Sequence, residues 1–565
     1  MVAIVHTDMT DEVTTPQRRA AHLAVGSWDD RTLSSQVRDH ARADGDRMAV
    51  VAPAASRTYA QLDHDADRVV GFLQAAGVRQ GDVVAVQLPN WYATVAIGLG
   101  VLRLGAVLNP MVTIYRRREL DHMIGVGNAR VLFVPGTYRG FDHAVMAQEL
   151  RRRYPELVTV TVTDPTTDPG WFDDWLAAVP APAQPSAVEP AAVSQLLFSS
   201  GTEAAPKAIM HTEQTAGFGV RSAVRSLGLG TDEIVWMPSP IGHSTGFNFG
   251  VRLALDHGYR LVLQDRWDAT TAADLVRAND CTFTVAATTF LADLVRHCAA
   301  EGVALPSLRL FSSGGAPVPE ELVVAARELD LTVLRLYGST EVLVATWNRP
   351  DAPAEKLCGT DGRALDGVEV QVRDEQDRPV VGAAGEIVVR GPACSVGFFA
   401  DEVRTTRTFV DGWVRSGDLG VIDEQGHLTV VGRKKEIIIR GGMNVAPREI
   451  EEVICQVDGV RAAAVVGMPD DRLGEIGCAC VVLDPGVTLT LARLVEQLTG
   501  LGMAAYKLPE QLVLVSELPA TPSGKVQKHR LVAALSDPSS SDRALVRSSE
   551  RRGPVAPEPE SSGSS

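Results

Sequence analysis

Over most of its length the chain alternates between two kinds of hydrophobic pattern. In residues 56–140, apolar residues at helical spacing, as in 59–73, alternate with short apolar runs such as 83–88. The alternation returns in residues 234–344. The strand candidates there are 259–263, 283–287 and 309–312. Strands that alternate with helices are typical of parallel sheets covered by helices, so this pattern predicts an α/β fold.

The pattern changes in the last third of the chain. Residues 367–432 contain short β-runs separated by turns, which predict a small β-rich subdomain within a large N-terminal domain, 1–432. Helical patterns then surround two apolar runs, which predicts a mobile α+β C-terminal domain over 436–535. The helix candidates are 446–457 and 491–498, and the strand candidates are 462–466 and 478–483.

Both ends of the chain lack this periodicity. Residues 1 to about 30 are polar and predict a loosely held arm. The tail, 536–565, is rich in Ser, Pro, Arg and Glu and poor in apolar residues, so we expect it to be disordered.

Charge and cysteine content narrow the function. The chain has 54 Lys and Arg against 70 Asp and Glu, a net charge of -16, which disfavours nucleic acid and anionic membranes as partners. No signal peptide and no run of 18 apolar residues is present. Seven cysteines, with no CxxC pair, do not suggest a disulfide framework. The sequence therefore predicts a cytoplasmic protein that is not inserted in a membrane.

One segment suggests phosphate chemistry. Phe198-Ser-Ser-Gly-Thr-Glu-Ala-Ala-Pro-Lys-Ala208 follows an apolar strand and offers the hydroxyls and backbone N–H groups that a polyphosphate needs. Lys207 adds a positive charge, but Glu203 puts a carboxylate where a phosphate oxygen is expected. By composition alone, an ordinary Ser/Gly surface turn fits equally well.

Four later motifs accompany this loop in a fixed order. They are Leu336-Tyr-Gly-Ser-Thr-Glu341, Gly412-Trp-Val-Arg-Ser-Gly-Asp418, residues 432–451 with Gly-Arg-Lys-Lys-Glu at their start, and Pro519-Ala-Thr-Pro-Ser-Gly-Lys-Val-Gln-Lys528. In this order and spacing the motifs resemble the adenylate-forming superfamily, which includes acyl-CoA synthetases, peptide-synthetase adenylation domains and luciferases. The resemblance covers Trp28 to Leu535.

The resemblance implies a reaction in two steps, with ATP, magnesium and CoA as cofactors. A carboxylate attacks the α-phosphate of ATP and releases pyrophosphate, and a thiol then captures the acyl-adenylate. The resemblance further implies that Thr340 holds phosphate, that Glu341 binds magnesium and that Lys525 places positive charge at the α-phosphate and carboxylate. His243 would lie where the carboxylate pocket meets the phosphate.

The remaining roles are also carried over from the resemblance. Lys434, in the segment 433–435, would be the hinge of the small domain. The phosphate loop would comprise Ser199, Ser200, Gly201, Thr202 and Lys207. The adenine and ribose contacts would be Gly314, Gly315, Ala316, Tyr337, Gly338, Ser339, Asp418 and Arg433. The pantetheine tunnel would be lined by Gly441 and Gly442.

Simpler structural roles stay open for several of these residues. Glu341 fits a carboxylate at the start of a helix, and Asp418 fits a turn residue after glycine. His243 fits a buried core histidine, Lys525 a solvated loop lysine, and Gly441-Gly442 a tight turn between strands.

The loop departs from the superfamily pattern Thr-Thr-Gly-x-Pro-Lys-Gly at Glu203, Ala204 and Ala208. A carboxylate about 4 Å from a phosphate charge costs about 4 kcal/mol at an effective dielectric near 20, which is on the order of a thousandfold in ATP affinity. An acyl-adenylate lacks the β- and γ-phosphates and escapes this cost. Two enzymes fit: a ligase that mainly converts an adenylate made by a partner enzyme, and an ordinary two-step acyl-CoA synthetase.

The acid itself is weakly specified. The stretch 237–250 resembles ligases of alicyclic and medium-chain acids, and its small residues suggest space for a bulky ring system. The predicted pocket residues are Gly242, His243, Ser244, Thr245, Gly246 and Gly314. No Asp is placed to bind an amino group, which disfavours amino acids. A carrier protein's phosphopantetheine arm as acceptor, and a non-catalytic binding protein, are the alternatives to a CoA ligase, and no pattern indicates an oligomeric state.

Overall fold

The computed structural model describes residues 16–183, 187–199, 206–315, 318–434, 436–440, 443–470, 473–501, 503–521, 524–537, 540, 542 and 545–551. The chain forms two compact units. The larger comprises Met1–Ser416, Gly420–Val430 and Pro522–Gly524, and the smaller Gly417–Leu419, Val431–Thr521 and Lys525–Ser565. Among the described residues, no helix combines the length and apolar character needed to cross a bilayer.

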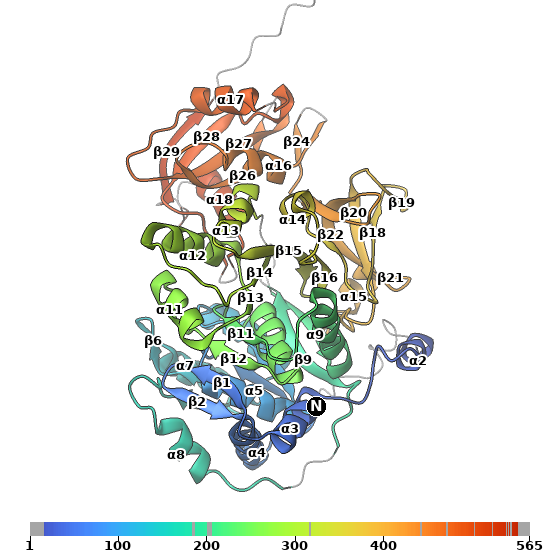
Figure 1. Cartoon of the computed structure of the whole chain (residues 1–565), viewed down its shortest axis with the longest axis vertical. Helices are drawn as coiled ribbons and strands as arrows, with labels where there is room; N and C mark the ends of the chain where they lie inside the picture. The colour runs from blue at the N-terminus through green and yellow to red at the C-terminus, as the bar shows by residue number, and fades with distance from the viewer. Residues whose placement is uncertain are drawn as a thin grey trace, which may run out of the picture. The chain divides into compact units, whose positions relative to one another are not determined.

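The largest sheet of the larger unit has nine strands in the order β17-β16-β15-β14-β13-β11-β12-β1-β2 (Figure 1). The strands from β15 to β1 in this order are parallel, which confirms the α/β prediction, and antiparallel strands close both edges. Their bounds are β1 (Met48–Ala52), β2 (Ala55–Thr58), β11 (Ile234–Met237), β12 (Arg260–Leu263), β13 (Phe283–Val285), β14 (Leu310–Gly314), β15 (Thr332–Ser339), β16 (Leu343–Trp347) and β17 (Arg363–Ala364).

A second sheet has six strands in the order β10-β9-β4-β3-β5-β8. All neighbours are parallel except β9 and β10, which form an antiparallel hairpin. The bounds are β3 (Val83–Val86), β4 (Val107–Pro110), β5 (Val131–Pro135), β8 (Val158–Val162), β9 (Val193–Ser199) and β10 (Lys207–Thr212), and a separate small hairpin pairs β6 (Thr137–Tyr138) with β7 (Phe141–Asp142).

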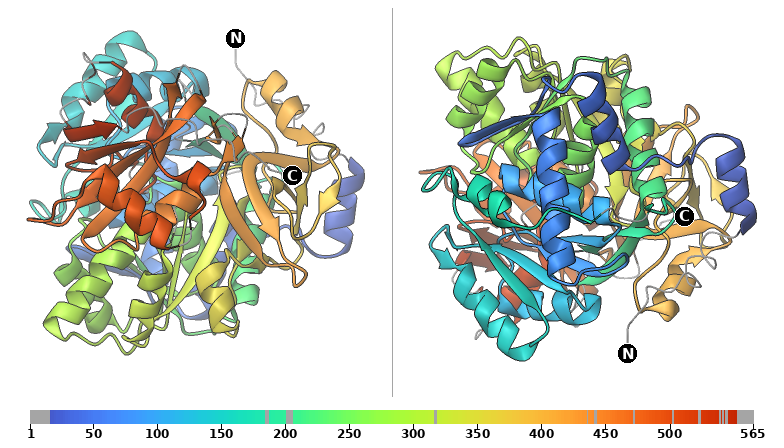
Figure 2. Two further views of the ribbon diagram at one scale, coloured as in Figure 1. Left: turned by 90° about the horizontal axis from the view of Figure 1, so that it is seen from above. Right: turned by 90° about the horizontal axis from the view of Figure 1, so that it is seen from below.

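Helices accompany both sheets. α4 begins where Thr58 and Gln61 form a capping box, and it packs against α5 (Figure 2, blue). α5 is apolar on every side, and all its residues are buried. The helices are α2 (Pro16–Ala24), α3 (Leu33–Ala43), α4 (Tyr59–Ala75), α5 (Tyr92–Leu104), α6 (Arg117–Gly127), α7 (His143–Arg153), α8 (Trp171–Ala178), α9 (Glu213–Leu227), α10 (Leu253–Asp256), α11 (Ala269–Asn279), α12 (Thr288–Glu301), α13 (Glu320–Arg327), α14 (Ala354–Gly359) and α15 (Glu402–Thr408), with the π-helix η1 (Thr245–Arg252).

Two further sheets follow along the chain. The first has the order β19-β18-β20-β22-β21, with β23 beside β22. Its bounds are β18 (Glu369–Arg373), β19 (Pro379–Val380), β20 (Gly385–Arg390), β21 (Phe409–Val410), β22 (Trp413–Ile422) and β23 (Leu428–Arg433).

The other sheet belongs to the smaller unit and has the order β25-β24-β27-β28-β29, with β26 beside β27. Its elements are β24 (Ile438–Arg440), β25 (Met443–Val445), α16 (Pro447–Ile454), β26 (Val460–Asp470), β27 (Gly474–Leu483), α17 (Leu491–Gly500), η2 (Ala505–Lys507), β28 (Gln511–Val515), α18 (Lys528–Ser536) and β29 (Val546–Arg551).

Both predictions for the chain ends were wrong in part. Within the arm predicted to be loose, residues 16–24 form α2, and Trp28 is buried and donates its indole N–H to Pro392 O at 3.0 Å. Within the tail predicted to be disordered, β29 pairs with all five residues of β28, with one register shift between Leu514 and Val515. Both segments are ordered by partners far away in the sequence, which a local pattern does not show.

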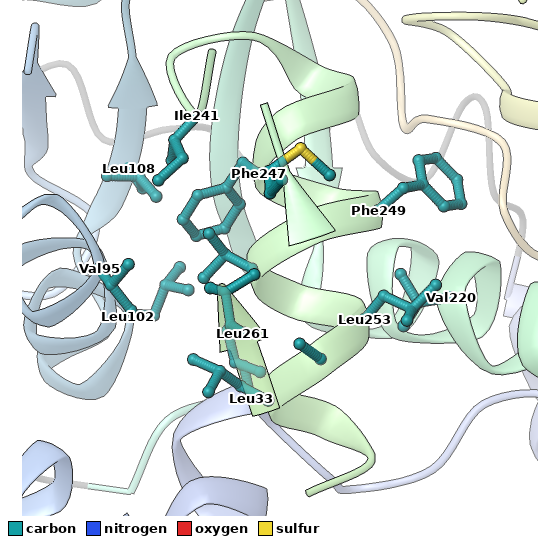
Figure 3. Packing of buried hydrophobic residues seen from close by; sticks show 14 of the residues in the cluster. Leu33, Val95, Leu102, Leu108, Val220, Ile241, Phe247, Phe249, Leu253 and Leu261 are labelled. Atoms are coloured by element: carbon teal, nitrogen blue, oxygen red, sulfur yellow. The ribbon is translucent and has the colours of Figure 1, made fainter. Parts of the chain in front are cut away.

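The largest hydrophobic core of the chain surrounds η1. In Figure 3, Phe247 points from η1 toward Leu108 of β4, and Phe249 leaves the other side of the helix. The Phe249 ring meets Trp347 of β16 edge-on, with 5.7 Å between centroids. The core therefore fixes η1 between the two large sheets, and η1 begins two residues after the predicted site residue His243.

Candidate active site

The predicted phosphate loop connects the two strands of the β9–β10 hairpin. Ser199 and Lys207, both predicted loop residues, are paired across the hairpin. Seven residues, 200–206, separate them, and Glu203 is the central one. Four predicted residues of this connection lie outside the described residues: Ser200, Gly201, Thr202 and Glu203.

A buried amide pair ties this hairpin to η1. Gln195 of β9 and Asn248 of η1 each donate to and accept from the other at 3.2 Å, and both side chains are fully buried. π-helical turns are rare and are frequent at functional sites. The strand that enters the phosphate loop and the helix that follows His243 are therefore held together.

His243 is half-buried in the loop between β11 and η1. The ring Nδ1 of His243 accepts a hydrogen bond from the backbone N–H of Thr245 at 3.3 Å, and the backbone N–H of His243 donates to Pro240 O at 3.0 Å. A neutral imidazole whose Nδ1 accepts carries its proton on Nε2. His243 is thus in the tautomer that donates from Nε2, as hydrogen bonding to a carboxylate or phosphate oxygen requires.

The side chain of Asn90, which sequence reasoning missed, holds the loop that carries His243. Its Nδ2 lies 3.3, 2.9 and 3.1 Å from the carbonyl oxygens of Met237, Ser239 and Gln264, and its Oδ1 accepts from Ile241 N–H at 2.8 Å. Asn90 is 4% exposed. It follows β3, and its partners follow β11 and β12, so it joins the carboxyl ends of strands from both sheets, where α/β proteins bind ligands. The one signal in the sequence was a polar residue shortly after an apolar strand, next to Pro89.

The structure corrects the reason given for the small pocket residues. A Cβ on Gly242 would lie 2.2 Å from Met111 O, and one on Gly246 would lie 2.1 Å from Pro240 O. These glycines therefore allow close backbone packing and do not open space for a ring system. A Cβ on Gly314 would likewise lie 2.4 Å from Leu336 O. Gly315 has a φ of +79°, which favours glycine. The other small residues of this stretch, Ser244 and Thr245, are half-buried.

Thr340 and Glu341 lie in the tight turn between β15 and β16. Leu343, the residue after this turn, has a φ of +57°, which is uncommon for leucine. The Glu341 carbonyl accepts from Ser395 N–H at 2.7 Å, and both predicted side chains are half-buried. Tyr337, Gly338 and Ser339 form the end of β15, where Tyr337 is 7% exposed.

His211 of β10 is a second residue that sequence reasoning missed. The ring is fully buried, with Nε2 2.8 Å from Thr340 O and Nδ1 3.1 Å from Thr215 Oγ1. Burial lowers the pKa of His211 to about 4, so the ring is neutral near pH 7.

The predicted magnesium ligand fits an ion that arrives with the nucleotide. Among the described residues, no group of three or more His, Cys, Asp or Glu side chains could hold a metal. Magnesium commonly binds to one or two carboxylates together with substrate phosphates and water. The role of Glu341 as the ligand of a magnesium ion bound with ATP is compatible with this mode of binding and stays a prediction.

The predicted ribose contacts are paired with each other. Arg433 Nε lies 3.1 Å from Asp418 Oδ1, and Asp418 is 8% exposed. The predicted hinge residue, Lys434, is exposed, and its backbone N–H donates to Gly417 O at 2.9 Å. The pairing of β22 with β23 thus brings these three predicted residues together.

Lys525 and Thr521 are joined by two hydrogen bonds. The N–H of Thr521 donates to Lys525 O at 2.7 Å, and Lys525 N–H donates to the Thr521 hydroxyl at 3.1 Å. Gly524 has a φ of +79°, as glycine readily adopts. The other predicted residues, Ala316, Gly441 and Gly442, lie outside the described residues.

The order of these elements can be compared with known proteins. The sequence profile of the AMP-binding enzymes matches residues 37–399, and that of the AMP-binding enzyme C-terminal domain matches residues 449–525. The chain belongs to the AMP-binding enzyme family. The resemblance of the motifs to the adenylate-forming superfamily is thereby confirmed.

Comparisons with individual proteins indicate the branch of the family to which this AMP-binding enzyme belongs. It is 34% identical to the medium-chain fatty-acid–CoA ligase of Escherichia coli K12, over 91% of this chain and 92% of the relative. It is 32% identical to the 2-hydroxy-7-methoxy-5-methyl-1-naphthoate–CoA ligase of Streptomyces carzinostaticus, over 91% and 95%. ATP-bound MatB from Rhodopseudomonas palustris matches the structure with a TM-score of 0.81 and 28% identity, over 90% of this chain and 99% of MatB. The AMP-binding enzyme is therefore an acid–thiol ligase of the CoA ligase branch.

Proposed function

We propose that this carboxylate–CoA ligase has a slow ATP-dependent half-reaction and mainly converts a preformed acyl-adenylate to the acyl-CoA thioester. The observation behind the proposal is Glu203, the central residue of the connection between Ser199 and Lys207. In the superfamily this connection surrounds the β- and γ-phosphates of ATP. A negative charge there opposes ATP and leaves an adenylate unaffected.

The residues for the second half-reaction match the superfamily pattern. In that step the thiol sulfur forms a bond to the acyl carbon, the bond to the AMP oxygen breaks, and the thiol proton passes to solvent. AMP leaves as an anion, so donors toward its phosphate stabilise the transition state. We assign this role to Thr340, to Lys525 and to the Nε2–H of His243, with Asp418 and Arg433 at the ribose.

When ATP and magnesium are bound, they supply the leaving pyrophosphate and the charge neutralisation of the first half-reaction. Glu341 would hold the magnesium and Lys207 would contribute positive charge at the base of the loop. The chain thus keeps residues for both steps. The more Glu203 slows the first half-reaction, the more the enzyme depends on adenylate made by a partner adenylating enzyme.

We further propose a bulky alicyclic or polycyclic acid as the substrate. The proposal is supported by the Streptomyces relative, whose named substrate is a naphthoate, and by the small side chains of Ser244 and Thr245. Gly242 and Gly246 lend it no support, because their missing side chains would meet backbone.

A paired assay tests the proposal. One arm supplies free acid, ATP and CoA, and the other supplies synthetic acyl-adenylate and CoA, each with a panel from medium-chain to bicyclic acids. Glu203→Thr combined with Ala204→Gly should raise the first rate by up to about a thousandfold and leave the second rate nearly unchanged. The control is Glu424→Thr, which removes one negative charge from an exposed turn residue.

The other outcomes identify the alternatives. A wild-type enzyme that adenylates briskly would show an ordinary two-step synthetase, and a double variant that gains nothing would show that Glu203 does not oppose ATP. Thioester formation on a phosphopantetheine carrier but not on free CoA would show a carrier-loading ligase. Adenylate binding without turnover in either arm would show a binding protein.

A further inference from the structure

His211 connects the strand that leaves the phosphate loop to the turn that carries Thr340 and Glu341. β10 begins at Lys207, and His211 is the fifth residue of that strand. Its ring is fully buried, with one nitrogen on Thr340 O and the other on the Thr215 hydroxyl of α9. Two of the ligand-binding segments assigned above are therefore bridged by one side chain.

The positions of the protons in this bridge follow from its partners. Thr340 O is a carbonyl and only accepts, so Nε2 must carry the proton and donate. In a neutral ring Nδ1 is then an acceptor. The Thr215 hydroxyl lies 3.1 Å from Nδ1 and 3.2 Å from Thr212 O, and it shares its one proton between these two acceptors. The Thr215 oxygen in turn accepts from the backbone N–H of Thr212 at 3.0 Å. Each nitrogen of the ring thus has a defined partner.

The turn closes through the N–H of Val342, which donates to Ser339 O at 3.3 Å, and through the pairing of Ser339 with Leu343. The carbonyls of Thr340 and Glu341, which are consecutive, accept from His211 Nε2 and from Ser395 N–H respectively. The next positions include Leu343 in a left-handed conformation, which surrounding contacts must hold in place. Loss of His211 would remove the side-chain hydrogen bond to the peptide of the residue that is assigned to the phosphate.

We infer that His211 is a positioning residue for the nucleotide phosphate, which it serves by fixing the peptide of Thr340 relative to β10. The inference rests on the proposed role of Thr340 in phosphate binding. A positioning residue differs from one that only fills the core in a measurable way. If His211 positions the phosphate site, its replacement should weaken the binding of ligands that carry a phosphate more than the binding of ligands without one.

AMP and adenosine separate these two roles, since they differ only in the phosphate. With calorimetry on the full-length enzyme, His211→Leu should weaken AMP binding about tenfold, the value of one well-placed hydrogen bond. Adenosine binding should change less than about twofold. Equal losses for AMP and adenosine, or no loss for either, would overturn the inference.

Two amide variants sharpen the test. Gln places its amide nitrogen near the position of Nε2 and can donate to Thr340 O, whereas Asn reaches only the position of Nδ1. His211→Gln should therefore recover most of the AMP affinity, and His211→Asn should behave like leucine. The reverse order would contradict the role assigned to Nε2. The matched control is His143→Leu, because His143 is also fully buried and its Nε2 lies 3.0 Å from the backbone oxygen of Thr113.

A second measurement keeps the inference separate from the proposed function. If the wild-type enzyme binds AMP no better than adenosine, the proposed phosphate site is wrong. The rate of amide hydrogen exchange in residues 339–343 then tests, without any ligand, whether His211 holds this turn in place. Faster exchange of this turn in His211→Leu, with no change in His143→Leu, supports the positioning role, and unchanged exchange refutes it.

Discussion

Replacing Asn90 by aspartate should destabilise the larger unit strongly although the two side chains have nearly the same shape. The new oxygen would stand where Nδ2 now lies, 2.9–3.3 Å from three carbonyl oxygens. Asn90 is 4% exposed, so water does not replace the lost donor. Only the contact with Ile241 N–H survives, because that contact uses the acceptor oxygen.

The size of the effect follows from these contacts. Two N–H donors are lost, each worth about 1 kcal/mol net, and buried carbonyls without a donor add about 1–3 kcal/mol each. Met237 O keeps the N–H of Gln264 as a donor, so two carbonyls, those of Ser239 and Gln264, lose the donor that Asn90 supplies. We therefore expect a loss of about 4–8 kcal/mol in the free energy of unfolding. A protonated aspartate can donate one hydrogen bond, and the folded state favours that form. The deficit relative to wild type should accordingly shrink as the pH is lowered.

The measurement is the calorimetric transition of the larger unit, together with the rate of thioester formation from acyl-adenylate. Because Asn90 holds the loop that carries His243, that rate should fall more than tenfold even at temperatures where the variant is folded. Asn128→Asp, at an exposed helix end, is the control. A variant within about 0.5 kcal/mol of the wild type, with an unchanged rate, would refute the assignment of Asn90 as the support of this loop.

Three further predictions concern other parts of the chain. Gly442→Phe should abolish thioester formation and spare adenylate binding, since only the predicted tunnel is blocked, and unchanged CoA turnover would disprove the tunnel. Lys434→Pro should trap one domain orientation and stop turnover of adenylate. Lys434→Ala keeps the N–H that donates to Gly417 O and serves as its control, and normal turnover in the proline variant would argue against a hinge. The pKa of His211 is about 4 in the folded chain against an ordinary 6.5, so only the unfolded chain takes up a proton between these values. Stability should therefore fall by up to about 3 kcal/mol between pH 6.5 and pH 4 in urea titrations, and His211→Leu should abolish this part of the pH dependence.

The fold was predictable wherever its strands are apolar and locally patterned. The predicted strand 283–287 contains β13, and the predicted helix 446–457 contains α16, because an apolar run and helical spacing are properties of the segment itself. β29, with the sequence Val-Arg-Ser-Ser-Glu-Arg, carries no such signal and is a strand through its pairing with β28.

The site was predictable to the extent that its residues lie in recognisable motifs. Asp418 and Arg433 were chosen by resemblance, and the structure places them 3.1 Å apart. Their contact with ribose, like the hinge and the domain boundaries, stays a prediction. Asn90 and His211 were missed because each acts on the backbone of segments more than 100 residues away. Such contacts leave no trace in a short stretch of sequence.

β29 also protects the edge of the sheet in the smaller unit. Without it, β28, whose sequence is Gln-Leu-Val-Leu-Val, would present a row of unpaired N–H and C=O groups along an apolar strand, the usual template for intermolecular β-pairing. β29 covers that edge with Ser548, Ser549 and Glu550, which are exposed and polar, and Glu550 additionally accepts from the N–H of Leu491 at the start of α17. A chain shortened at Ser536 would keep every motif residue named above and lose its protection against aggregation.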